Sequence, residues 1–441
     1  MTSAKKQVAK AFSVYVGTSI INRALPFMLL PILTWYLSPA EYGILAVYQT
    51  LIGFALPFIG MKMETNITRN IFKRKQSEVA KIFSNMLVIL CSTAIICSLL
   101  LAICLAFLDS VCDIPKRWLY LIPVITVMNM LNQFNLTFLR NQQRAVLYGL
   151  LEVLNTALNL ALTVLMVVGF HYGWEGRALA TVLASVVFGI VGIIYVWRSG
   201  FIRFEIDPPT IKEILNVSMP LVPYSLGAMI IFMSDRIFLD RMVGKTAVGL
   251  YATAYSFGMI VTLVTEAFNR AWSPWMYARL ANMTDERKIE IVRFTYAYKA
   301  FLIGLAFAVT IASHLLIKVM TNERYHSAGQ FIVWVALANA VNGMYAVLMP
   351  YSVNEGKTRP LAAIMTVAAV VNLIGNYVLI KMNGAVGAAQ ATLLAYVISY
   401  SLNWWHASNI YPMPWLKKEV FVSQFWRNRL VSLIRRVLPE A

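Results

Sequence analysis

Charged residues are scarce in this chain: they make up 13% of its 441 residues, whereas 59% are hydrophobic. A soluble globular protein has about 25% charged residues, so the composition excludes a water-soluble enzyme and also a disordered chain. The apolar residues fall in blocks of about 20 between short polar stretches, which is the length that crosses a hydrocarbon core. The sequence therefore predicts an all-α, polytopic membrane protein.

Cysteine and histidine are also sparse, with four of each. Three of the four cysteines (Cys91, Cys97 and Cys104) share one apolar segment without sharing a helix face, a spacing that suits apolar filler and neither a metal site nor a disulfide framework. The chain has no Walker loop, nucleophile elbow or kinase motif. We expect no metal, no cofactor, no ATP hydrolysis and no enzymatic activity.

Twelve apolar segments are long enough to span a bilayer as helices, which satisfy their backbone polar groups internally. They cover residues 12–37, 40–61, 82–108, 118–139, 146–170, 178–197, 219–240, 248–272, 294–320, 328–350, 361–381 and 387–407. The first is far longer than the apolar region of a signal peptide, so we expect it to be retained. An even number of spans places both termini on one side.

Lysine and arginine are unevenly distributed between the two sides. Of the 38, the connections on the side of the termini hold 26, the opposite connections hold eight and the spans hold four. Cytoplasmic loops carry an excess of positive charge. We therefore expect cytoplasmic termini in a bacterial inner membrane, and the net charge of +18 implies no nucleic-acid partner.

Three short patterns of the first half recur in the second. They are Gly43 and Ala46 with Gly249 and Ala252, the nine residues from Gly176 with the nine from Gly387, and Asn155 and Asn159 with Asn372 and Asn376. Six spans in each half make this a parallel repeat about an axis along the membrane normal, which is typical of transporters.

The repeat predicts four regions. Residues 1–197 form a six-helix lobe, 198–218 a cytoplasmic connection and 219–407 a second six-helix lobe, with a cavity between the lobes. Residues 408–441 mix aromatic and basic residues, a pattern that favours an amphipathic tail lying on the anionic inner leaflet. Membrane lipids are thus expected partners.

Arg23 is the most deeply placed charge, about 16 Å into the first span at 1.5 Å per residue. Burying such a group costs about 2.5–3.5 kcal/mol on insertion scales, which favours a functional role. Arg23 either binds an anionic head group in the central cavity or forms an internal ion pair with Glu152 or Glu64.

Asp235 and Arg236 are adjacent in the seventh span. They form either an interfacial cluster with local pairing or a cavity wall in which Arg236 binds substrate and Asp235 orients it or titrates.

The remaining polar groups within spans are weaker candidates. Arg270 follows Glu266 at helical spacing and forms a structural pair with it or binds substrate. Lys299 is an interfacial anchor or lies at the cavity entrance. Glu152 is, like Asp235, a candidate for ion coupling. Asn132 belongs to an amide-rich fourth span whose amides bond sugar hydroxyls or hold helices together.

Three motifs resemble those of bacterial polysaccharide (O-antigen type) flippases of the multidrug/oligosaccharidyl-lipid/polysaccharide exporter superfamily. The motifs are Leu37-Ser-Pro-Ala-Glu-Tyr-Gly-Ile-Leu, Ser234-Asp-Arg-Ile-Phe-Leu and Val248-Gly-Leu-Tyr-Ala-Thr-Ala-Tyr. The resemblance covers all twelve spans. It implies alternating access that moves an undecaprenyl-diphosphate-linked oligosaccharide from the cytoplasmic to the periplasmic leaflet, for lipopolysaccharide O-antigen or a similar surface glycan.

The resemblance also implies lateral portals beside spans 1 and 7 and a cationic cavity. Arg23 and Arg236 fall on those two spans. A polysaccharide polymerase and assembly proteins are the partners that such a pathway would supply.

Three alternatives remain open. A cation-coupled multidrug exporter of the same superfamily would need an acidic, aromatic cavity, whereas the charges within these spans are mostly basic. A membrane glycosyltransferase or ligase would need a large outer loop with carboxylates, and the outer connections here are short. A scaffolding role in an assembly complex is neither supported nor excluded.

Overall fold

The computed structural model of the chain describes residues 27–71, 74–107, 110–111, 114–142, 144–203, 205–280, 283–355, 357, 359–417 and 420. Within this part, ten helices are apolar enough and long enough to cross a membrane. A shorter apolar helix, Phe27–Tyr36, and α15, Val386–Ile410, accompany them. Each of the twelve predicted spans coincides with one of these helices, the first only from residue 27 on, and the all-α polytopic membrane fold is confirmed.

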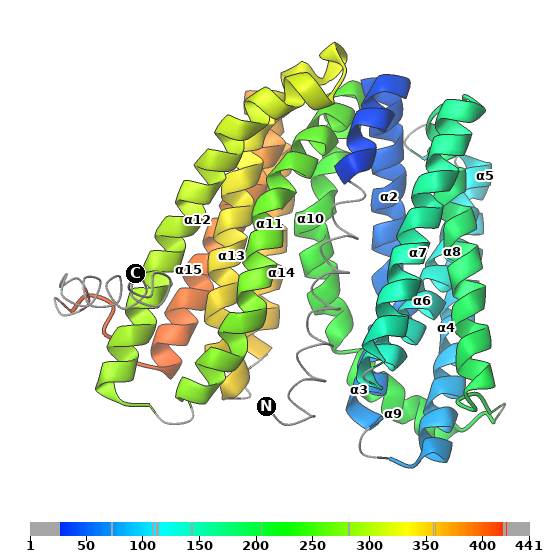
Figure 1. Ribbon diagram of the computed structural model, residues 1–441, viewed down its shortest axis with the longest axis horizontal. Coiled ribbons are helices and arrows are strands. Elements are labelled where there is room, and N and C mark those ends of the chain that lie inside the picture. Colours follow the sequence, from blue (N-terminus) through cyan, green and yellow to red (C-terminus); the bar gives the residue numbers. More distant parts are fainter. Residues whose placement is uncertain are drawn as a thin grey trace, which may run out of the picture.

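Two groups of long helices stand side by side, consecutive in the chain (Figure 1). The first comprises α2 (Pro39–Gly60), α4 (Gln76–Phe107), α6 (Leu121–Asn141), α7 (Ala145–Val164) and α8 (Gly173–Arg198). The second comprises α10 (Leu221–Met242), α11 (Lys245–Leu280), α12 (Asp285–Met320), α13 (Gly329–Asn354), α14 (Arg359–Asn383) and α15. Between the groups, α2 packs against α10 and α11.

Several short elements lie between the long helices. Most fall where the sequence predicts only connections, whereas residues 118–119 and 165–169 fall inside the predicted spans 118–139 and 146–170. The short elements are α3 (Glu64–Asn70), the paired strands β1 (Ser110–Val111) and β2 (Ile114–Pro115), α5 (Lys116–Leu119), the π-helix η1 (Leu165–Gly169), α9 (Pro208–Ser218) and the 3₁₀ helix η2 (Glu323–Ala328). They are too short to show a hydrophobic period. Because α9 and α5 lie at opposite ends of the bundle (Figure 1), we name these ends the α9 end and the α5 end.

The motif that begins at Leu37 has a clear structural role, because it forms the start of α2. The Ser38 hydroxyl accepts a hydrogen bond from the Glu41 backbone N–H, and the Glu41 carboxylate accepts one from the Ser38 N–H at 2.9 Å. This reciprocal capping box satisfies two backbone donors that the helix start leaves free. Pro39 suits the first helical position because it lacks an N–H.

Two glycines that the repeat makes equivalent lie against each other where α2 meets α11. A Cβ added to Gly43 would lie 2.0 Å from the Lys245 carbonyl oxygen, and a Cβ added to Gly249 would lie 1.8 Å from the Pro39 carbonyl oxygen. Only glycine allows the two backbones to approach this closely. The Tyr325 hydroxyl adds a hydrogen bond to the Leu37 carbonyl at 3.0 Å. The two halves are therefore tightly joined at the α5 end.

The connection between the halves is ordered by Asp207 at the start of α9. Its carboxylate accepts hydrogen bonds from the Thr210 backbone N–H and hydroxyl and lies 3.0 Å from the Lys81 ammonium. These Thr210 and Lys81 contacts hold the pKa of Asp207 below its usual value. At the other end of α9, Asn66 of α3 donates to the Ser218 hydroxyl at 2.8 Å.

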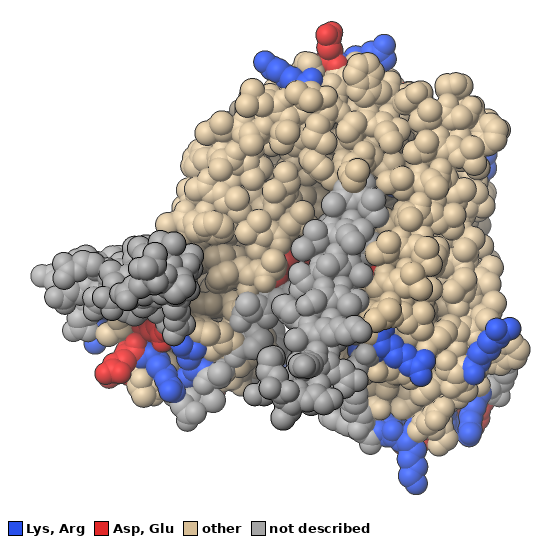
Figure 2. All heavy atoms as spheres, viewed as in Figure 1, with Lys and Arg blue, Asp and Glu red and all other residues tan. Residues whose placement is uncertain are grey.

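The surface of the bundle suits a bilayer. On the face in Figure 2, Lys and Arg gather at the two ends, and the band between them is almost entirely uncharged. Large apolar side chains on the outward faces are exposed, for example Leu99 of α4 at 60% and Leu315 of α12 at 70%. Exposed apolar area on this scale is unfavourable in water and favourable in lipid.

Candidate functional site

Two of the predicted substrate-binding cations cannot be placed. Arg23 precedes the described residues, and Arg270 lies on α11 with a side chain outside the described part. Their binding roles stay predictions, as does an ion pair between Arg23 and Glu152. The described partner of Glu64 is Lys62, at 3.7 Å.

Asp235 and Arg236 form a buried pair on α10. Arg236 Nη1 lies 3.2 Å from Asp235 Oδ1 and donates to the Phe232 carbonyl at 2.9 Å. The Tyr251 hydroxyl donates to the other carboxylate oxygen, and the Tyr255 ring centre lies 4.9 Å from the guanidinium carbon. Asp235 thus contacts Arg236, and the two charges compensate each other in a site where the carboxylate is fully buried and the arginine is 8% exposed.

Lys299 of α12 lies in an aromatic cage. Its ammonium is between 4.8 and 5.3 Å from the ring centres of Tyr296, Tyr400, Trp404 and Trp415. Ring faces attract a cation at such distances. The cage joins α12 and α15 to the segment after α15, since the Tyr296 hydroxyl also donates to the Trp415 carbonyl at 3.0 Å. This geometry suits an anchor more than an open entrance.

Asn132 and Glu152 are half-buried on α6 and α7. Asn132 faces α8, where its Cα lies 3.6 Å from a Cβ built on Gly192. Neither residue is among those that line the two cavities described next.

A cavity of about 420 Å³ lies between the two halves, and we call it the central cavity. Its wall combines the α9-end part of α2 with α10, α13, α14 and α15, and Lys62 stands at its margin. Polar and aromatic side chains that could contact sugars line it: Tyr224, Ser225, Asn342 and Tyr396. Toward the α5 end, the Gly43–Gly249 contact closes the space between α2 and α11.

A second cavity, of about 240 Å³, lies within the first half around Arg177, and we call it the Arg177 pocket. Arg177 Nη1 donates to Asn159 Oδ1, to the Thr163 hydroxyl at 2.9 Å and to the Thr181 hydroxyl at 3.3 Å. The buried Nε of Arg177 has no hydrogen-bond partner among the described residues. Four further polar side chains line the pocket: Asn129, Asn155, Thr156 and Ser185.

The equivalent place in the second half is closed. Asn372 Oδ1 accepts from the Ser234 hydroxyl at 2.9 Å and from Asn376 Nδ2 at 3.2 Å, and Asn372 Nδ2 donates to the Thr392 hydroxyl at 3.4 Å. These four side chains, which we call the amide cluster, are all buried. The fully buried Ala388 takes the position that Arg177 has in the first half.

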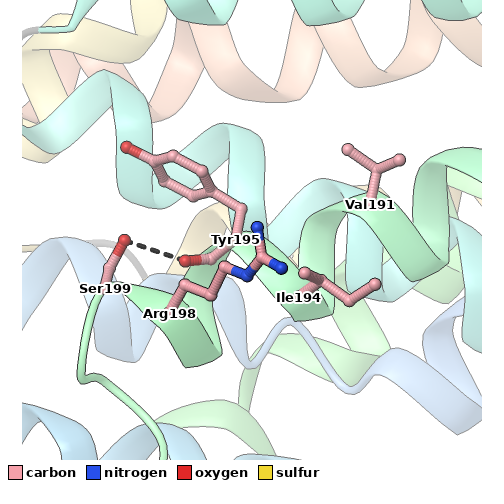
Figure 3. A pocket seen from close by; sticks show the side chains of 5 residues that line it. All are labelled: Val191, Ile194, Tyr195, Arg198 and Ser199. Atoms are coloured by element: carbon pink, nitrogen blue, oxygen red, sulfur yellow. Dashed lines mark hydrogen bonds between the residues drawn. The ribbon is translucent and has the colours of Figure 1, made fainter.

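A surface groove of about 420 Å³ follows α8 to the α9 end (Figure 3). Val191 and Ile194 form its apolar wall, and Arg198 and Ser199 its polar rim. The Tyr195 hydroxyl accepts a hydrogen bond from Arg144 at 2.6 Å. An apolar wall beside guanidinium groups at the end of a spanning helix suits contact with lipid head groups.

Sequence reasoning missed Arg177 and Lys62 as site residues. It counted Arg177 among the outer connections because the predicted span begins at 178, whereas α8 begins at Gly173. The repeat held a usable signal: Arg177 stands where the second half has Ala388, four residues before a threonine that both halves share. Among the described residues no three His, Cys, Asp or Glu side chains could hold a metal ion together.

Comparisons with known proteins agree with this geometry. Residues 8–280 match the family described as polysaccharide biosynthesis protein, and residues 220–378 match the MatE family. An uncharacterized membrane protein of Haemophilus influenzae is 21% identical over 395 residues, which cover 88% of this chain and 92% of the relative. A probable low-salt glycan biosynthesis flippase of Haloferax volcanii, Agl15, is 25% identical over 270 residues, or 59% of this chain and 56% of that protein.

Two solved structures share the fold. The lipid II flippase MurJ, in an inward closed conformation, matches with a TM-score of 0.67 at 12% identity. The match covers 88% of this chain and 86% of the MurJ chain. An inward-facing multidrug transporter of the MATE family, within the MOP superfamily, has a TM-score of 0.66 at 15% identity, with 88% and 95% covered.

Proposed function

The chain belongs to the polysaccharide biosynthesis protein family, and from that premise we propose that it moves a lipid-linked oligosaccharide across the bacterial inner membrane. The substrate in this proposal is an undecaprenyl-diphosphate-linked unit, which passes from the cytoplasmic to the periplasmic leaflet for O-antigen-type surface polysaccharide. The protein acts as a transporter and not as an enzyme. The names of Agl15 and MurJ, a glycan flippase and a lipid II flippase, support this substrate class.

The observation that carries the proposal is the central cavity, which lies between the halves on the α9 side of a tight contact between them. The Gly43–Gly249 contact joins α2 to α11 at the α5 end, and the cavity lies nearer the α9 end with Lys62 at its margin. The excess of Lys and Arg on the α9 side favours a cytoplasmic location for that end. The described arrangement then corresponds to an inward-facing state, ready to receive a substrate made in the cytoplasm.

Alternating access follows if the two halves, residues 1–197 and 219–407, rock about the connection 198–218. Opening of the α2–α11 contact would release the glycan outward, while the polyprenyl tail stays in lipid. A diphosphate needs cations inside a low-dielectric space, and a guanidinium binds phosphate oxygens in pairs. Arg23 and Arg236 on the portal spans would serve this purpose in the proposal, Arg236 after it separates from Asp235, which holds it in the described arrangement.

The other candidate residues have subsidiary roles in the proposal. Arg270 and Lys299 would add positive charge at the cytoplasmic side, and Asn132 would contact sugar hydroxyls. Coupling to an ion gradient would use Asp235 or Glu152. Residues 408–410 end α15 and Trp415 packs at Lys299; the rest of the predicted tail 408–441, which lies outside the described residues after residue 420, would lie on the inner leaflet. A polysaccharide polymerase would receive the product.

A multidrug exporter is the second candidate, because the MatE match and the MATE-family fold favour it. Export of organic cations requires free carboxylates in the cavity. Asp235 is already bound by Arg236 and Tyr251, and the described residues that line the central cavity include Lys62 but no Asp or Glu. The balance of charge therefore favours an anionic substrate.

The proposal is tested by deleting the gene in its host and complementing at matched membrane abundance. We expect the deletion strain to lose surface glycan and to accumulate lipid-linked intermediate on the cytoplasmic face. Wild type should restore both, and Arg23→Ala should fail to restore them while Arg23→Lys restores part. Normal glycan and normal intermediates in a deletion strain without a redundant flippase would contradict the proposal and favour drug export.

A further inference from the structure

We propose that the Arg177 pocket is an oxyanion-binding subsite, separate from the central cavity, that recognises an acidic group of the transported substrate. This inference rests on the proposed function for the identity of the substrate, but binding at the pocket can be measured without transport. The oxyanion is either the carboxylate of an acidic sugar or a phosphate of the carrier lipid, and both carry oxygens that a guanidinium binds in pairs.

The first argument is charge. Arg177 lies on α8 within the membrane-spanning region, and no carboxylate of the described residues forms an ion pair with it, in contrast to Arg236 with Asp235 and to Arg117 with Glu175. Arg177 is half-buried, and a charge partly withdrawn from water without a counterion is costly. The protein retains this cost at Arg177, and an anionic ligand would offset it.

The second argument is the way in which the guanidinium is held. Asn159, Thr163 and Thr181 bind its Nη1, which fixes the plane of the group from one side. The Nε on the opposite edge is buried and has no described partner. A carboxylate or phosphate commonly binds along such an edge through two parallel hydrogen bonds. The pocket thus holds a guanidinium that is oriented in advance and has one binding edge left over.

The third argument is the lining of the pocket. Asn129, Asn155 and Ser185 offer amide and hydroxyl groups to a sugar, and Leu29 and Leu160 offer an apolar surface to a ring face. A volume of about 240 Å³ is ample for one sugar ring. A few polar groups in a partly apolar concave site are typical of small-ligand recognition.

The competing explanation is that Arg177 is a strut that holds α7 against α8. The second half argues against this explanation, because it packs the equivalent helices α14 and α15 with Ala388 at the same position. There the amides of Asn372 and Asn376 bond to each other, and Asn376 Oδ1, the counterpart of the oxygen that Arg177 binds, has no partner among the described residues. The second half therefore packs its two helices without a cation at this position.

The test uses the purified full-length protein in lipid nanodiscs and isothermal titration with methyl glucuronide, methyl glucoside and farnesyl diphosphate. We expect the wild-type protein to bind methyl glucuronide, farnesyl diphosphate or both, and an anionic probe to bind about tenfold more tightly than methyl glucoside. Arg177→Gln should remove that advantage, and Arg177→Lys should retain part of it. Arg324→Gln, at an exposed arginine of η2, is the matched control and should bind as wild type does.

The anionic probe that loses affinity in Arg177→Gln identifies the source: the glucuronide points to an acidic sugar, the diphosphate to the carrier. Because Arg177→Gln could impair folding, Asn155→Ala provides a second variant that keeps the guanidinium and its three partners. It should weaken binding of the same probe about threefold or more with an unchanged melting temperature.

Failure of the wild-type protein to prefer an anionic probe would overturn the proposal, as would equal binding by the wild type and a folded Arg177→Gln variant. These outcomes leave the flippase function standing if complementation succeeds. Conversely, a deletion strain with normal glycan and intermediates would remove the flippase function and leave the measured binding in place.

Discussion

The two halves of this protein share an amide pair and use it differently. In the second half, Asn372 and Asn376 bond to each other, to Ser234 and to Thr392 in a closed, buried cluster. In the first half, the equivalent Asn159 binds Arg177 beside an open cavity. One position of the repeat, alanine in one half and arginine in the other, separates a packing element from the pocket that we propose as a binding site. The comparison shows how a symmetric scaffold acquires function on one side.

The largest expected effect comes from giving the second half the arginine that the first half has. Ala388→Arg would place a charge in a fully buried position beside the amide cluster. An uncompensated buried charge costs about 3–5 kcal/mol, so we expect the variant to unfold or to fail to accumulate in the membrane. Arg177→Ala is the matched change in the first half and should keep its melting temperature within about 3 °C. Size-exclusion thermostability of both variants measures the difference, and equal stability would contradict the assignment.

The next effect concerns a place where the halves are alike. Gly43→Leu and Gly249→Leu should each prevent close contact of α2 and α11, because even a Cβ would overlap a backbone carbonyl oxygen. We expect each to reduce surface glycan to about a tenth, since a gate that cannot close stalls the cycle. Gly304→Leu on α12, where an added Cβ meets nothing within 4 Å, is the control. Transport by both variants at the level of Gly304→Leu would show that the contact is not a gate.

A smaller effect sharpens the contrast between the clusters. Asn372→Ala removes the acceptor shared by Ser234 and Asn376 and should cost about 1–3 kcal/mol, because it leaves buried polar groups unsatisfied. Asn155→Ala, the equivalent change, faces the Arg177 pocket and should cost less than about 0.5 kcal/mol. Thermal unfolding of the two variants in the same detergent tests this. Equal losses would mean that both amides are packing elements.

The smallest effect concerns the connection between the halves. The native contacts of Asp207 hold its pKa below the usual value, so its stabilisation of α9 is complete above the ordinary pKa and is lost as the pH falls through the native pKa. The hydrogen-exchange rate of residues 205–214, corrected for its intrinsic pH dependence, should therefore rise when the pH falls below about 4. In Asp207→Asn, exchange corrected for its intrinsic pH dependence should stay constant over the same range. A similar rise in the variant would assign the effect to another group.

The sequence predicts the helices well because each spanning segment must satisfy its own backbone, which makes a long apolar run sufficient. It also reveals that Gly43 and Gly249 are equivalent. It does not reveal that they touch, since contact between α2 and α11 depends on how the halves pack across some 200 residues. Short elements such as α9 escape detection because their ends are set by single capping contacts, here that of Asp207.

The candidate site is harder to predict for the same reason. Asn159 and Thr163, which bind Arg177, lie on α7, whereas Arg177 lies on α8. The hydrophobic period of each helix does not reveal how the two helices face each other. A boundary error of a few residues moved Arg177 from a membrane cavity to a loop. Asp235 and Arg236 are neighbours in the sequence, but whether the pair faces a cavity or closes on itself depends on Tyr251 and Tyr255 of the next helix.

The most direct test of the central claim is flipping in proteoliposomes of defined composition. A fluorescent, diphosphate-linked oligosaccharide would be placed in both leaflets, and its exposure on the outer face followed with a membrane-impermeant quencher. We predict that wild-type protein makes the protected pool accessible at least about tenfold faster than protein-free vesicles, and that Gly249→Leu vesicles stay at the protein-free rate. A wild-type rate equal to that of protein-free vesicles, with folded protein and an imposed ion gradient, would contradict the account.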